Sequence, residues 1–273
     1  MGTHPHRRIE DPHLSHSLRE INRIYGVRVD VEARAQSLHK FGHNTDVGQD
    51  ETGYTVWETG ADDPHETFVA DLVNSIDSIS SGEAGDGQVM VVQGHTSTTN
   101  SAGETVKTFV SQEVTLNGTT RVPLGTPLNR VQRAYNDGTT TLAGRVYIYE
   151  NGDLTAGKPQ TTTDIHLTVD PVSNQSEKAA LSLASTEYLI MTHMHFGVLE
   201  RTSATVEVSL QVRLQGKIFR TRETFAAGQG GADYDIVPYM VFPPNCDIRL
   251  TSISSANTTE VAGSISGYYA DIV

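Results

Sequence analysis

Hydrophobic and polar residues alternate with a period of two along most of the chain after about residue 85. Clusters of Gly, Pro, Asn or Asp separate the alternating segments, and no helical pattern lies between them. This arrangement favours antiparallel sheets over a parallel α/β sheet. We predict an all-β fold of antiparallel β-sandwich or jelly-roll-like modules. The eleven predicted strands lie within residues 88–96, 107–118, 129–138, 144–152, 164–170, 187–200, 204–216, 217–228, 234–245, 247–255 and 260–273.

The first 40 residues follow a different pattern. Apolar residues recur there at helical spacing, which predicts one short amphipathic helix between Asp11 and Gly26 with Leu14, Leu18, Ile21 and Tyr25 on its apolar face. An isolated helix of this length is only marginally stable in water, so we expect an N-terminal arm that gains order from a partner. We interpret the four histidines of this arm as solvated or partner-facing: His4, His6, His13 and His16.

Two stretches bear on domain organisation. The Gly- and Thr-rich stretch 150–164 is a candidate hinge, and it divides the chain into an arm (1–40), a β module (41–157) and a C-terminal β-sandwich module (158–273). A long loop within one sandwich is the alternative. Residues 66–80 fit a helix through Phe68, Leu72, Val73 and Ile76, and they fit an extended strand equally well.

Charge and hydropathy exclude two kinds of partner. The 33 acidic residues exceed the 20 basic ones, and a formal net charge of −13 repels a phosphate backbone, so direct nucleic-acid binding is not expected. The longest strongly apolar run has four or five residues, far fewer than a bilayer span needs, and no N-terminal export signal is present. We therefore expect no membrane insertion.

His193 and His195 stand one residue apart in the most apolar stretch of the chain. Alternate residues of a strand share a face, so the two imidazoles could share a metal ion. They supply two ligands at most, and His95 and His166 lie on other predicted strands. Three interpretations stay open: ordinary strand residues, which we favour, a pH-sensitive pair in an interface, or half of a structural metal site.

Signatures of enzymes are incomplete wherever the sequence approaches them. Val69 replaces the second histidine of an H-E-x-x-H pattern, and Ile265 stands where G-x-S-x-G requires serine. The Gly-rich stretch 228–233 precedes no helix, and 45–53 lacks the spacing of a calcium loop. The single cysteine, Cys246, excludes an intrachain disulfide and is expected to be a small buried residue. We predict no enzyme activity and no catalytic, cofactor-binding or metal residues.

Four segments resemble a known group of proteins. "LHKFGHNTDVGQDETGYTVWETG" (38–60) contains a K-F-G-x-N-x-D-V segment followed by W-x-x-G. The resemblance continues through 111–124, 128–152 and 242–269, and it covers nearly everything after the arm. These segments are similar to structural proteins of tailed bacteriophages. The matched residues are turns and strand edges, such as the Asn117–Gly118 hairpin turn.

This resemblance implies a virion component, assembled in the host cytoplasm, at the capsid surface, a head fibre, the neck or the tail. We expect a homo-oligomer, with a trimer as the first expectation, that docks to capsid, portal, neck or tail proteins through its arm. The alternative is a receptor- or carbohydrate-binding module of a phage fibre, which would expose clustered aromatic residues; the only tryptophan is Trp57. The matched residues do not distinguish these positions in the virion.

Overall fold

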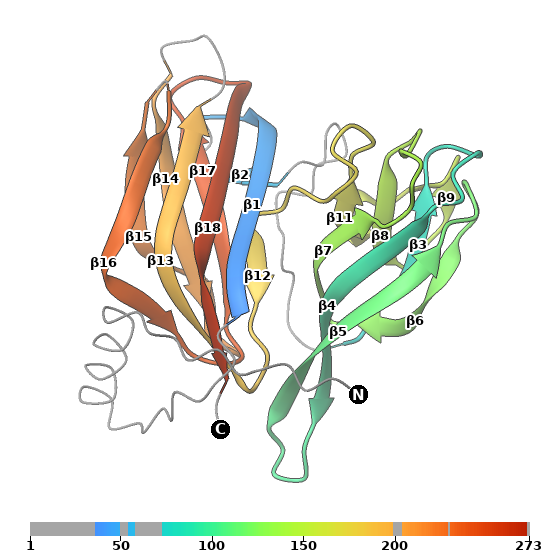
Figure 1. Ribbon diagram of the computed structural model, residues 1–273, viewed down its shortest axis with the longest axis horizontal. Coiled ribbons are helices and arrows are strands. Elements are labelled where there is room, and N and C mark those ends of the chain that lie inside the picture. Colours follow the sequence, from blue (N-terminus) through green and yellow to red (C-terminus); the bar gives the residue numbers. More distant parts are fainter. Residues whose placement is uncertain (1–35, 50–53, 58–72, 199–203, 229, 272–273) are drawn as a thin grey trace.

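A computed structural model describes residues 36–49, 54–57, 73–198, 204–228 and 230–271, and these form an all-β structure (Figure 1). Every pair of hydrogen-bonded strands is antiparallel, which confirms the all-β, antiparallel part of the predicted fold. Each of the eleven predicted strand segments contains a strand. The predicted helix and the arm histidines lie outside the described residues.

Residues 76–169 build one sandwich, here called the N-terminal sandwich. Apolar side chains from its two sheets, including Ile79, Val92 and Ile148, form a single core. One sheet contains, in spatial order, β11 (Ile165–Val169), β8 (Val146–Glu150), β3 (Ile76–Ser81) and β6 (Val122–Leu128). The other contains β5 (Thr105–Thr115), β4 (Val89–Thr99) and β7 (Arg130–Asn136).

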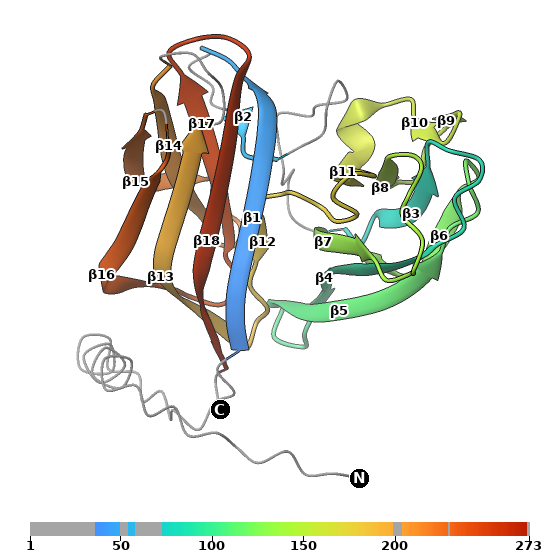
Figure 2. The same ribbon diagram turned by 45° about the horizontal axis from the view of Figure 1, so that its top comes forward.

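The second core belongs to the C-terminal sandwich, where Phe196, Leu250 and Ile265 are fully or almost fully buried. Its first sheet contains β1 (Gln36–Val47), β18 (Thr259–Asp271), β13 (Glu187–Val198) and β16 (Ala232–Phe242). Its second sheet contains β12 (Ala180–Ser182), β17 (Asp247–Ser254), β14 (Val206–Arg213) and β15 (Arg220–Ala227), with β2 (Tyr54–Thr55) beside β17. Figure 2 shows β1 and β12 on the side that faces the N-terminal sandwich.

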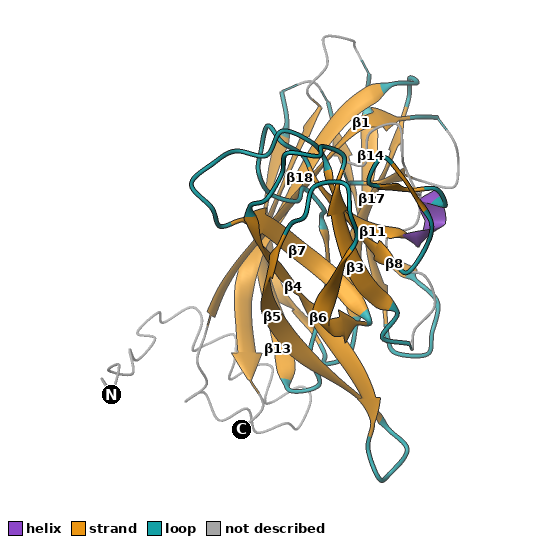
Figure 3. Cartoon of the chain, turned by 90° about the vertical axis from the view of Figure 1, so that its right-hand side faces the viewer, coloured by secondary structure: helices purple, strands orange, loops and turns teal. Residues whose placement is uncertain are grey.

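Strand pairing does not follow the predicted domain bounds at residues 40 and 157. β1 starts inside the predicted arm and pairs with β18, and β11 lies beyond the predicted hinge yet pairs with β8. The hinge stretch itself holds the short pair β9 (Leu154–Thr155) and β10 (Lys158–Pro159) and a 3-10 helix, Thr162–Asp164. Strands otherwise dominate the described chain (Figure 3). Independent folding of the three predicted units stays a prediction.

Two elements show how the sequence pattern works. In the ambiguous stretch 66–80, Ile76–Ser81 forms β3, so the extended alternative holds for that part, while Phe68 and Leu72 lie outside the described residues. In β1 the alternate residues Lys40, Gly42 and Asn44 are buried. A β-carbon on Gly42 would meet the backbone oxygen of Val56 at 2.1 Å. Glycine therefore permits the close packing of β1 on the neighbouring chain.

Candidate functional site

A buried ionic cluster lies where the two sandwiches meet. Its centre is Asp247, the first residue of β17, whose side chain is 1% exposed. The N-terminal sandwich contributes Lys107 of β5, with Nζ 3.1 Å from Oδ1, and Arg130 of β7, with Nη2 3.3 Å from Oδ2. Arg213 of β14 places Nη2 2.6 Å from Oδ2. One carboxylate therefore joins strands of both sandwiches.

The surrounding cations keep Asp247 ionised. Burial favours the neutral acid and would raise the pKa of its carboxyl, but Arg130, Lys107 and Arg213 together outweigh burial and hold the pKa well below its usual value. Three positive charges around one negative charge leave the cluster with an excess of positive charge. Loss of the one carboxylate would leave three buried cations without an opposite charge, which is strongly destabilising.

Two further lysines are buried close to this cluster. The Nζ atom of Lys178 lies 4.6 Å from the ring centroid of Trp57 and donates a hydrogen bond of 2.7 Å to the backbone oxygen of His166. Lys40 of β1 donates to the backbone oxygen of Gln132 on β7. Burial, with Arg133 as the second cause, lowers the pKa of Lys40 to about 7, and burial lowers that of Lys178 well below the usual value. Both amines are therefore poor at holding a proton.

His95 of β4 is completely buried. Burial, followed by the charge of Lys107, lowers the pKa of its imidazole to about 3, so the ring is neutral at physiological pH. The ring packs edge-on against Phe109 with centroids 5.7 Å apart. Within the described residues neither ring nitrogen has a hydrogen-bond partner. His95 is not a candidate ligand with His193 and His195, because it lies in the other sandwich.

A cleft of about 220 Å³ opens beside these lysines, between the sandwiches. Its lining combines polar groups with apolar and aromatic walls, and it takes residues from β1, β4, β5, β7, β12, β13 and β18. The lining residues are Ser37, Leu38, His39, Lys40, Gln93, Phe109, Gln132, Arg133, Leu181, Glu187 and Tyr269. Clefts between packed units that contain a titratable group with a shifted pKa are frequent ligand sites.

Segments that carry the sequence resemblance supply much of this junction. Lys40 and Trp57 belong to 38–60, Arg130 and Gln132 to 128–152, and Asp247 to 242–269. The K-F-G-x-N-x-D-V segment is β1, in which Asn44 donates a 2.8 Å hydrogen bond to the backbone oxygen of Thr55. The junction thus gives a structural reason for polar residues that interrupt an otherwise apolar pattern.

His193 and His195 lie on the outer face of the sheet β1-β18-β13-β16, and each binds a carboxylate of β16. Nδ1 of His195 is 2.7 Å from Asp233, and Nδ1 of His193 is 3.0 Å from Asp235. The hydrogen bond from His195 is the main cause that lowers the pKa of Asp233. The histidines therefore share a face, as the alternation predicts, and their partners are acidic side chains.

A metal site is not formed by the described residues, which contain no group of three or more His, Cys, Asp or Glu side chains that could hold an ion. His166 is not near the pair but binds Glu150 at 3.0 Å in the N-terminal sandwich. The same outer face carries His43 of β1 between Glu177, at 3.3 Å, and Glu260, at 2.7 Å. The bond to Glu177 is the largest cause that raises the pKa of His43.

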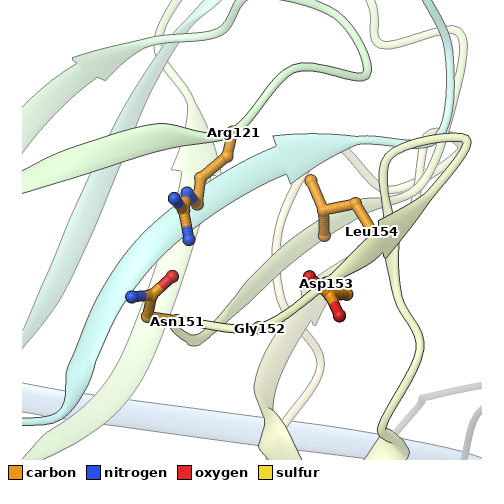
Figure 4. A pocket seen from close by; sticks show the side chains of 5 residues that line it. All are labelled: Arg121, Asn151, Gly152, Asp153 and Leu154. Carbon is orange, nitrogen blue, oxygen red and sulfur yellow. The ribbon is translucent and has the colours of Figure 1, made fainter.

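A second pocket, of about 530 Å³, lies at the N-terminal sandwich (Figure 4). Arg121 precedes β6, and its side chain points toward the loop between β8 and β9 (Figure 4). The pocket is lined by that loop, through Asn151, Gly152 and Asp153, and by Leu154, the first residue of β9. The polar side chains can bind hydroxyl groups, but the pocket is wide and none of its described lining residues is aromatic.

The remaining sequence candidates occupy structural positions. Burial raises the pKa of the Cys246 thiol to about 12, which removes its nucleophilic form at neutral pH. Ile265 is a core residue of β18, and Trp57 is only 1% exposed, so it offers no platform for a ligand. The stretch 228–233 joins β15 to β16 without a helix in its described part. Among described residues no helix is long and apolar enough to cross a membrane.

Comparison with known proteins yields little. No family model matches the chain, and no curated protein matches it. Among solved structures, the VP2 subviral particle of infectious bursal disease virus aligns at 10% identity over 94% of this chain and 77% of that chain, with a TM-score of 0.22. The T13 particle of the same virus aligns at 9% identity over 96% and 81%, with a TM-score of 0.20. TM-scores this low support no argument.

Sequence reasoning missed the ionic cluster. A signal exists: Asp247, Arg130 and Arg213 are charged residues inside or beside strands with alternating apolar positions. Charged residues are almost never fully buried unless they are paired. The sequence could therefore have identified these three residues as candidates for buried ion pairs. It could not have identified their partners, which come from distant segments that only the tertiary fold brings together.

Proposed function

We propose that this chain is a non-enzymatic structural protein of a tailed-phage virion, oligomeric and docked to the capsid, neck or tail through its N-terminal arm. The observation that carries the proposal is the sequence resemblance of segments 38–60, 111–124, 128–152 and 242–269 to such proteins. Support also comes from the way these segments are used: they build strands, tight turns and the junction between the sandwiches. A body of two packed β-sandwiches is suited to a structural role.

Docking through the arm gives a direct test. β1 begins at Gln36, so a chain lacking residues 1–34 keeps every described strand, whereas a chain lacking residues 1–47 also loses β1. Expressed during infection by a phage that lacks its own copy, the shorter deletion is expected to fold and to be absent from purified particles. Normal incorporation of this variant, measured by quantitative mass spectrometry of particles, contradicts arm docking. The longer deletion is the control for loss of folding.

Self-association is the second part of the proposal. Strands β15 and β16 are edge strands of the two sheets of the C-terminal sandwich. Exposed edges favour pairing with another chain unless they are covered or charged, and closed symmetric assembly covers surfaces of this kind. We expect a trimer in sedimentation velocity at tens of micromolar. A monomer of 29.6 kDa under these conditions contradicts self-association.

The alternative function is a receptor- or carbohydrate-binding module. The observation that favours it is the pocket at Arg121, Asn151 and Asp153, where a guanidinium, an amide and a carboxylate face one opening (Figure 4). A glycan array probed with the full chain tests this alternative. Binding that is lost in Arg121→Ala supports a receptor-binding role, and an array without signal leaves the purely structural role as the proposal.

A further inference from the structure

We propose that the cleft between the two sandwiches binds a carboxylate carried on a short apolar group. This site is independent of the virion role proposed above. It is defined by its lining residues, with Lys40, Arg133 and Tyr269 as donors and Leu38, Leu181 and Phe109 as apolar walls.

Lys40, Arg133 and Tyr269 each bring a hydrogen-bond donor to the lining of the cleft. The ammonium group of Lys40 has three donor positions, and one of them is used by the backbone oxygen of Gln132. Arg133 is exposed, with its guanidinium carbon 4.9 Å from the ring centroid of Tyr135. Burial, followed by the charge of Glu187, raises the pKa of the Tyr269 hydroxyl, so this group keeps its proton and is a donor at neutral pH. A guanidinium, an amine that is protonated below about pH 7 and a phenol line one space, and this combination favours an anionic, acceptor-rich ligand.

Two of the acceptors that line the cleft are already engaged. Oε2 of Glu187 accepts a 3.0 Å hydrogen bond from the backbone nitrogen of Ala184. Oε1 of Gln132 accepts a 3.1 Å hydrogen bond from the backbone nitrogen of Ser182. Glu187 is the only acidic residue in the lining formed by described residues. Each of these two oxygens is thus bound to a backbone nitrogen and not to Lys40 or Arg133.

The walls of the cleft set the size and the polarity of the rest of the ligand. Phe109 is 43% exposed, which is unusual for a large apolar side chain, and it stands at the cleft. Leu38 and Leu181 provide further apolar surface. A volume of about 220 Å³ is smaller than that of sites for drug-sized ligands, so the apolar part is a small group such as one ring or a short alkyl chain.

Binding should be coupled to proton uptake. Charged and titratable groups around the Lys40 amine are Arg133 of β7, Lys178 before β12, Glu187 of β13, His39 of β1 and Tyr269 of β18. Without a ligand the pKa of Lys40 is about 7, because burial and Arg133 oppose its charge. A bound carboxylate favours the protonated amine, so affinity is highest below pH 7 and decreases as pH rises above it.

Benzoate and benzamide form a matched pair of probes, since they have the same ring and differ in charge. With the full-length protein at pH 6.5, we expect saturable benzoate binding by isothermal titration calorimetry or by NMR shifts at the cleft, and at least about tenfold weaker benzamide binding. Benzoate affinity should decrease by about tenfold for each pH unit above about 7.5. Lys40→Met should lower the affinity for benzoate by about tenfold or more. The control is Lys217→Met, which changes an exposed lysine of the β14–β15 hairpin and should bind benzoate as the wild type does.

A second variant, Arg133→Gln, tests the site if Lys40→Met fails to fold, because it changes an exposed side chain. We expect it to bind benzoate several-fold more weakly than the wild type does. Equal affinity for benzoate and benzamide overturns the proposal. So does unchanged binding in both cleft variants, or no saturable benzoate binding up to about 10 mM. The carboxylate belongs either to a free small molecule or to a neighbouring copy of the chain. Benzoate that dissociates an oligomer in sedimentation identifies the second source, and benzoate that binds without this effect identifies the first.

Discussion

Lys107 and Asp247 form a salt bridge of 3.1 Å that joins β5 of the N-terminal sandwich to β17 of the C-terminal sandwich, and both side chains are 1% exposed. Burial of two charges is unfavourable unless they are paired, so we expect this contact to favour the observed arrangement of the two sandwiches. Arg130 and Arg213 bind the same carboxylate and strengthen this constraint.

Replacement of Asp247 by Asn tests this constraint. The variant keeps the size of the side chain but leaves three buried cations without their carboxylate, so we expect a loss of about 3–5 kcal/mol in the free energy of unfolding. Urea denaturation followed by circular dichroism measures it. Asp137→Asn, at an exposed position, is the matched control and should change little. A loss of less than about 1 kcal/mol in Asp247→Asn would mean that the cluster is not structurally important.

The low pKa of Lys40 predicts a dependence of stability on pH. The folded protein loses the proton of Lys40 near pH 7, whereas the unfolded chain keeps it up to about 10.5. Since the unfolded state binds more protons between these values, Lys40 contributes stability that increases with pH, by about 2 kcal/mol between pH 6.5 and pH 8.5. His43 has a raised pKa and contributes in the opposite direction over part of this range.

Comparison of the wild type with Lys40→Met separates the two contributions, because His43 is present in both proteins. The difference in unfolding free energy between them should change by about 2 kcal/mol from pH 6.5 to pH 8.5. A difference that is constant over this range shows that Lys40 is charged in the folded state throughout.

The close packing around Gly42 leads to a third prediction, which concerns stability. A β-carbon there would lie 2.1 Å from the oxygen of Val56 and 2.3 Å from the nitrogen of Ala179, and neither backbone atom can move freely. Gly42→Ala should therefore lower the free energy of unfolding by about 2 kcal/mol or more. In Gly85→Ala the added β-carbon meets nothing within 4 Å, so this control should be close to neutral. Equal stability of the two variants would refute the close packing of β1.

The sequence predicts the strands more completely than the site. All eleven expected segments contain strands because apolar side chains alternate along them. β1 is not predicted from the alternation, because its buried positions include Lys40, Gly42 and Asn44 instead of apolar residues. β6 is not predicted either, because it contains Pro123, Gly125 and Pro127, which are residue types typical of loops. The partners of Asp247 lie 34 to 140 residues away along the chain, and local patterns carry no information about such contacts.

The outer histidines give a fourth prediction. His193 and His195 each bind an exposed aspartate of β16, so replacing both by Gln should shift the melting temperature at pH 7.5 by less than about 2 °C. EDTA should have no effect, since the described residues form no metal site. A decrease in melting temperature with EDTA in the wild type, and not in the double variant, would restore the metal interpretation. Melting at pH 5.5 tests the pH-sensitive interpretation: a decrease in the wild type that the double variant lacks would support it.

The most direct measurement of the proposed virion role is a density map, at side-chain resolution, of virus particles produced from the genome that encodes this chain. Our account predicts density for both sandwiches, with Asp247 between Lys107, Arg130 and Arg213, in symmetric copies whose N-terminal residues contact capsid, neck or tail proteins. A fully interpreted particle with no density for this chain, from a preparation in which mass spectrometry also fails to detect it, would contradict the claim.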